Sequence, residues 1–194
     1  MTFTFENPGT SKSYTIIKKE LKYSVITLLA VVFSFVIHEF SHWLTGEILG
    51  YKMGMTLNKA YPVSGSFTQH WHYTLISSVG PIVTLIQSIC AFLLIRRDHN
   101  KVLYPFLLSS WYLELLSGVM NFRHANDLGR ISETFNLGLF TIPVIFVSIH
   151  FILVYKTVLR EKYPFKFILW TFLLILLFSS TWILLNNKFH IVIL

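Results

Sequence analysis

Five apolar stretches, separated by polar connections, dominate the pattern of the chain. They cover about residues 23–44, 73–95, 102–120, 137–155 and 167–185. Each contains roughly the 20 mostly apolar residues that a helix needs to cross the hydrocarbon core of a bilayer. The pattern therefore predicts five transmembrane helices, with no internal repeat among them.

The connection between the first two stretches, residues 46–72, has a different period. Met53, Met55 and Leu57 alternate with Gly54, Thr56 and Asn58. Alternation of apolar and small or polar residues is typical of a half-buried strand. We therefore expect an all-α membrane protein with about five transmembrane helices and a short surface β-hairpin between helices 1 and 2.

Composition supports the membrane assignment. The chain of 194 residues is 54% hydrophobic and only 13% charged, whereas soluble domains carry roughly 25% charged residues. Its formal net charge of +7 fits the Lys and Arg that collect near cytoplasmic loops and anionic lipids. We expect the lipid bilayer as a partner and no nucleic acid. The single cysteine, Cys90, excludes a disulfide within the chain.

Basic residues also predict the orientation. The segment before the first stretch and the connections at 96–101 and 156–166 carry eleven of the sixteen Lys and Arg. These three segments lie on one membrane face if there are five spans. The rule that basic loops stay in the cytoplasm then places the N-terminal side inside and the C-terminal side outside. We expect a multi-pass protein of a prokaryotic plasma (inner) membrane.

The first apolar stretch ends in HEFSH, where charged groups are costly. His38 and His42 are four residues apart, so on a helix they lie on one face and can bind the same zinc ion. Glu39 can act as the general base toward a water molecule whose pKa zinc lowers to about 7. A surface helix that displays two His and one Glu is the plainer alternative, but it does not explain their place in an apolar span.

A catalytic zinc site needs a third protein ligand. The first and third stretches run in the same direction across the membrane, so residues that follow the third stretch share a face with HEFSH. The candidates there are Asp127, His124 and Glu133. The residues alone leave the choice open, with His124 as the main rival of Asp127.

HEFSHWLTGEILG resembles the first-helix signature of site-2 proteases, the intramembrane zinc metalloproteases of peptidase family M50. NDLGRI (residues 126–131) resembles the family segment that supplies the third ligand, with Asp127 at the ligand position. SVGPIVT (residues 78–84) resembles the segment of the intervening helix that contains Gly80 and Pro81. The resemblance implies zinc held by His38, His42 and Asp127, and a catalytic Glu39.

The chain departs from the family at several positions. Thr84 stands where the family usually has Asn, and Leu128 replaces a Gly. The family also has an Asn, thought to hold substrate, about eight residues before the ligand Asp. Asn121 lies six residues before Asp127. Glu114, Ser117 and Asn121 form one helical stripe that fits a substrate contact or a structural hydrogen-bond network equally well.

Together these features predict a basic cytoplasmic tail over residues 1–22, a catalytic core of three helices over 23–136, and two additional transmembrane helices over 137–194. The expected function is hydrolysis of peptide bonds in or near transmembrane segments of membrane proteins. A helical substrate must unwind first, and we expect the strand around Met53–Leu57 to pair with it. The alternatives are a non-enzymatic metal carrier or sensor and an inactive scaffold derived from the protease.

Overall fold

The computed structural model describes residues 8–194, and the side chains from residue 18 onward. Its helices are α1 (Pro8–Ile48), α2 (His70–Asp98), α3 (Tyr104–Met120), α4 (Asp127–Thr134), α5 (Thr141–Glu161) and α6 (Phe165–Phe189), with a 3₁₀ turn, η1 (Lys101–Leu103), before α3. All the α-helices except α4 are long and apolar enough to cross a membrane, α3 together with η1. The predicted fold class, an all-α multi-pass membrane protein with five spans, is confirmed.

The helices differ from the predicted spans at their ends. α1 begins at Pro8, so residues 8–22, expected as a tail, continue the first helix; residues 1–7 of that tail lie outside the described residues. α5 begins at Thr141 and not near 137, because the chain turns at Gly138, whose φ is +81°. Apolarity marks the part of a helix that lipid covers, and polar turns extend the helix beyond it.

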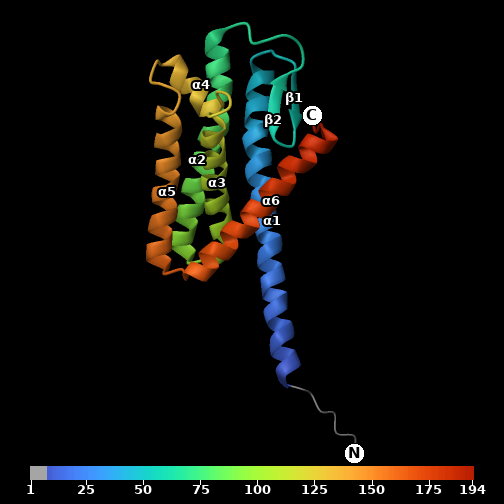
Figure 1. Cartoon of the computed structure of the whole chain (residues 1–194), viewed down its shortest axis with the longest axis vertical. Helices are drawn as coiled ribbons and strands as arrows, with labels where there is room; N and C mark the ends of the chain where they lie inside the picture. Colours follow the sequence, from blue (N-terminus) through green and yellow to red (C-terminus); the bar gives the residue numbers. More distant parts are fainter. Residues whose placement is uncertain (1–7) are drawn as a thin grey trace, which may run out of the picture.

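The spans form a bundle in which α1, α2 and α3 pack together and α5 packs against α2 and α3. α6 crosses the bundle diagonally and packs mainly against α1 (Figure 1). The buried apolar core includes Ile95, Tyr104, Leu107 and Ile175, which are fully inaccessible. Most of the outward surface of α5 and α6 is apolar, as expected for helices that face lipid.

Two strands, β1 (Met53–Thr56) and β2 (Lys59–Pro62), form an antiparallel hairpin with Met55 opposite Ala60. The hairpin lies at the end of the bundle that also contains α4 and the last turns of α6 (Figure 1). The surface hairpin predicted between helices 1 and 2 is therefore confirmed. Its position brings β2 to the same end of the molecule as HEFSH.

The chain adds a third extended segment to this hairpin. Residues 191–194 return from α6 to β1, where Val192 forms a bridge with Thr56. The Met55 N–H donates to the Leu194 carbonyl at 2.9 Å, and the Ile193 N–H donates to the Met55 carbonyl at 2.8 Å. β1 is consequently paired on both edges, and β2 has the only edge without a neighbouring strand among the described residues.

Candidate functional site

His38 and His42 lie in the last three turns of α1 and are both buried, with 4% and 6% of their surfaces exposed. Their spacing of four residues stacks the two rings on one side of the helix. The two Nε2 atoms are 3.2 Å apart. The helix thus presents two imidazole nitrogens at one point, as the sequence predicted for a helical HEFSH.

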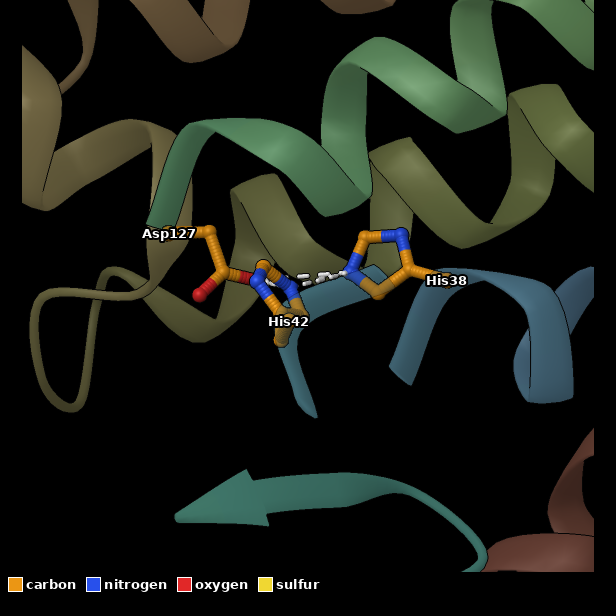
Figure 2. A group of neighbouring side chains, drawn as sticks. All are labelled: His38, His42 and Asp127. Carbon is orange, nitrogen blue, oxygen red and sulfur yellow. Dashed lines mark hydrogen bonds and ion pairs between the residues drawn. The ribbon is translucent and has the colours of Figure 1, made fainter. Parts of the chain in front are cut away.

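Asp127 completes a cluster with these histidines, although it comes from a different part of the chain. It is the first residue of α4, and its Oδ2 atom is 3.4 Å from His38 Nε2 and 3.5 Å from His42 Nε2 (Figure 2). Within residues 18–194, no other group of three His, Cys, Asp or Glu side chains converges in this way. His124 is exposed and Glu133 lies at the far end of α4, so neither of them joins the cluster.

Hydrogen bonds at the Nδ1 atoms of His38 and His42 determine the direction of the lone pair on each imidazole. His42 Nδ1 faces the Ile76 carbonyl at 2.5 Å, and a carbonyl can only accept, so Nδ1 carries the proton. His38 Nδ1 is 2.8 Å from the Thr84 hydroxyl, which donates its own proton to the Gly80 carbonyl and must therefore accept from His38. In both neutral rings Nε2 is left with a free lone pair.

α2 passes close to the cluster because Gly80 has no side chain. A Cβ atom there would overlap Nε2 of His42 and lie 2.8 Å from Nε2 of His38. Pro81 follows within the helix. It has no N–H to donate to the Ser77 carbonyl, so this turn of the helix is disturbed. The neighbouring Ile76 carbonyl is the one that accepts from His42. The Gly80-Pro81 pair therefore shapes the wall behind the histidines.

A tight turn between α3 and α4 holds Asp127 in place. Asn121, at the end of α3 and 3% exposed, accepts the Asn126 N–H at 2.7 Å and donates to the Ser117 and Gly118 carbonyls. The Asn126 amide donates to the Ser117 hydroxyl at 3.0 Å. Both polar atoms of the Asn121 side chain are thus engaged in this turn, which favours the structural alternative for the stripe that contains Ser117 and Asn121.

The second carboxylate oxygen of Asp127 faces Arg130, one turn along α4. Arg130 Nη1 is 3.8 Å from Oδ1, and its Nε donates to the Ala125 carbonyl at 3.0 Å. Burial opposes ionisation of Asp127, but positive charge on protonated imidazoles of His42 and His38 outweighs burial and holds the pKa of this carboxyl well below its usual range. Asp127 is therefore a carboxylate aimed at two imidazole nitrogens.

Glu39 and the three clustered residues line one cavity of about 940 Å³. Glu39 is half-buried on α1, next to His38 in sequence. Across the cavity lie Lys59, Ala60 and Tyr61 of the hairpin, and the remaining wall includes Asn186 and His190 at the end of α6. Glu39 and the three clustered side chains therefore share one space, which is large enough to admit water and a peptide segment.

Glu114 lies within electrostatic reach of His38, His42 and Asp127 but does not line the cavity. It is fully buried on α3, and neither of its carboxyl oxygens has a hydrogen-bond partner among the described residues. The residues that line the cavity do not include it. The structure therefore separates Glu114 from the cavity that Glu39 and the cluster share.

Two partners of the histidines were not singled out from the sequence as such. Thr84 appeared there only as a departure from the resembled family, although its distance of four residues from Gly80 places both on one helical face. The Ile76 carbonyl is a backbone group, which no residue type reveals. Both become visible only when α1 and α2 are packed together.

The arrangement brings three electron-pair donors, two imidazole nitrogens and a carboxylate oxygen, to within 4.8 Å of one another. Such a group needs a positive charge, which extra protons on the imidazoles or a bound cation can supply. Comparisons of the chain with models of protein families, with curated proteins and with solved structures find no match.

Proposed function

We propose that this chain is an intramembrane zinc metalloprotease of the site-2 protease type, which hydrolyses peptide bonds in or near transmembrane segments of membrane proteins. The observation that carries the proposal is the convergence of two Nε2 lone pairs and the Asp127 carboxylate, with Glu39 beside them on the same cavity. The resemblance of HEFSH and NDLGRI to that family's segments agrees with this geometry.

The distances within the cluster fit zinc. Nitrogen and oxygen ligands at typical zinc distances stand about 3.3–3.6 Å apart in a tetrahedral site. The three separations here are 3.2, 3.4 and 3.5 Å. Thr84 and the Ile76 carbonyl supply the outer hydrogen bonds that zinc-binding histidines usually have. His38, His42 and Asp127 would therefore hold the ion with little rearrangement.

In this proposal the chain's own residues divide the work of hydrolysis. Zinc would supply a Lewis acid that polarises a carbonyl or activates water. Glu39 takes a proton from the attacking water and delivers it to the departing amine nitrogen, as a general base and then a general acid. Arg130 and the Asn121 turn keep Asp127 directed at the histidines. The position of the cluster near one end of the bundle gives water a route from the surface.

An unwound substrate segment would find its backbone partners on the hairpin. β1, which we expected to pair with substrate, is occupied on both edges in the structure, by β2 and by residues 191–194. The free edge of β2 is the better candidate because Ala60 and Tyr61 line the cavity opposite the cluster. Strand addition to an exposed edge binds peptides largely through the main chain, so the proposed contact moves from β1 to β2.

Two substitutions test the assignment of roles. Glu39→Gln should keep one zinc per chain and lower the cleavage rate of a model transmembrane substrate by at least about 100-fold, the usual contribution of a general base. His42→Ala should lose both zinc and cleavage. Metal content is measured by elemental analysis of the purified protein, and cleavage is measured in detergent or liposomes.

Glu20→Gln is the matched control, because Glu20 is an exposed carboxylate on the same helix and far from the cavity. It should cleave as the unmodified chain does. Cleavage by Glu39→Gln at the control rate would refute the proposed chemistry. Zinc binding without cleavage in the unmodified chain would favour a metal carrier or sensor, or an inactive scaffold.

A further inference from the structure

Most backbone groups on the outward edge of β1 have partners. In an antiparallel hairpin with a two-residue turn, alternate residues direct their backbone groups away from the partner strand. Here these are Met53, Met55 and Leu57. The Met53 N–H donates to the Glu47 carboxylate at 2.7 Å, and Met55 is bonded through both its N–H and its carbonyl to residues 193 and 194.

The tip of the hairpin is fastened to α6. Trp182 Nε1 donates to the Leu57 carbonyl at 2.8 Å, and the Leu57 N–H donates to the Asn186 Oδ1 atom at 3.4 Å. The Asn186 amide group also donates to the Thr56 hydroxyl at 3.3 Å and to the Asn58 side chain. Side chains of the fifth span therefore bind the backbone of the hairpin directly.

α6 then delivers an extended apolar segment to the same edge. The helix ends at Phe189, and His190 adopts a left-handed conformation with φ 46° and ψ 51°. Residues 191–194, Ile-Val-Ile-Leu, run on as an extended segment joined to β1 by a single bridge. Two-stranded hairpins are at best marginally stable alone, and a third strand with apolar side chains adds the stability they lack.

These contacts bear on the candidate site because the hairpin forms the wall of the cavity opposite the His-His-Asp cluster. Ala60 and Tyr61 of β2, and His190 and Val192 beside β1, all line that cavity. In the view of the cluster, a hairpin strand passes across from the three side chains (Figure 2). The position of this wall depends on what holds β1.

We propose that residues 191–194 are an internal latch. Their pairing with β1 keeps the hairpin across the cavity, and their release lets the hairpin move away and opens the cavity to an extended substrate segment. The identity of what enters rests on the proposed protease function, whereas the mechanical role of the latch does not. The fifth span thereby regulates access to the site.

A cysteine reporter tests the latch without any assay of activity. In a full-length Cys90→Ser background, Ala60→Cys places a thiol on the cavity wall, and its reaction rate with a water-soluble maleimide measures opening. Ile193→Pro removes the N–H that donates to Met55. It should raise the labelling rate about two- to tenfold, the range that corresponds to one backbone hydrogen bond.

Ile193→Ala is the matched control. It changes the same residue but keeps the N–H that donates to Met55, because only proline lacks this donor. Its labelling rate should equal that of the reporter alone. Trp182→Phe is a milder second variant, which loses only the bond to Leu57 and should also raise labelling. It keeps the test valid if Ile193→Pro does not fold.

Equal labelling of Ile193→Ala and of the folded latch variants would overturn the latch. Cleavage of the model transmembrane substrate, followed in parallel with the Cys90→Ser chain and each latch variant, should rise with labelling. If labelling separates the variants while no chain cleaves, the latch stands and the proposed function falls. If the chains cleave at rates that ignore labelling, the function stands and the latch does not control access.

Discussion

Two sets of buried polar side chains in this bundle differ in how their atoms are partnered. The first set, His38, His42 and Asp127, is held from behind by Thr84, the Ile76 carbonyl and the α3–α4 turn. The second set, Ser88, Glu114 and His150, lies on α2, α3 and α5 and is fully inaccessible. Each member of the second set has side-chain atoms without a hydrogen-bond partner among the described residues.

This difference separates side chains that are arranged as a candidate site from polar side chains that are only buried in the bundle. In the first set the outer hydrogen bonds use one nitrogen of each ring and leave the other nitrogen aimed at a common point. In the second set the unpartnered atoms do not converge on any group of potential ligands. An unpartnered buried polar atom costs about 1–3 kcal/mol, so the two sets should respond to mutation in opposite ways.

Gly80→Ala should have the largest effect on the first set. The added methyl group would overlap the Nε2 atoms that the proposal assigns to zinc. Zinc affinity should fall by more than the roughly 10–100-fold that the loss of an outer hydrogen bond causes. The helix itself should remain folded, because Ala has the higher helix propensity by about 1 kcal/mol. Titration with a fluorescent chelator and circular dichroism measure the two quantities.

Gly118→Ala provides the comparison for this change. Gly118 is also a helical glycine, but a Cβ atom there would meet only Val147 at 3.7 Å and Pro143 at 3.9 Å, which are ordinary contacts. Zinc affinity should stay within about twofold of the original, well below the effect of losing an outer hydrogen bond. A similar loss in both variants would mean that crowding of the bundle, and not of the cluster, controls binding.

Thr84→Val should have the next largest effect, because it keeps the shape of the side chain and removes the acceptor for His38 Nδ1. Loss of such an outer partner lowers metal affinity by about 10–100-fold. Thr84→Ser retains the hydroxyl and should bind zinc nearly as well as the original chain. The same chelator titration compares the two. Equal affinities would show that the ring orientation of His38 does not depend on Thr84.

The sequence predicts only part of this site, because some of its contacts join neighbouring residues and others join segments far apart in the chain. The spacing of His38 and His42 is local, so helix geometry alone places both rings on one face. Asp127 was one of three candidates from the rule of shared membrane faces, and only the α3–α4 turn brings it, and not His124, to the histidines. Thr84 and the Ile76 carbonyl depend on how α2 packs against α1.

The fold divides in the same way. Hydropathy locates the five spans and alternation locates the hairpin, since both patterns are carried by consecutive residues. Neither pattern reveals α4, because its eight residues are of mixed polarity and resemble a loop between two spans. The helix follows the turn that Asn121 holds. The extended segment 191–194 is also missed, because its partner, β1, lies far away in the sequence.

The smallest expected effect on the site, and the sharpest test of the comparison, is that of Glu114→Met. Methionine fills a similar volume and removes a fully buried carboxyl group whose oxygens have no partner. The free energy of unfolding should rise by about 1–3 kcal/mol, with zinc affinity unchanged within about twofold. Ser34→Ala should instead lower the free energy of unfolding, because Ser34 lies in a buried network with Ser109 and Gln87 and its loss removes one hydrogen bond from each of them. Thermal unfolding in detergent gives the sign of each change. A Glu114→Met chain that is destabilised and loses zinc would place Glu114 with the first set, and the division between the two sets would fail.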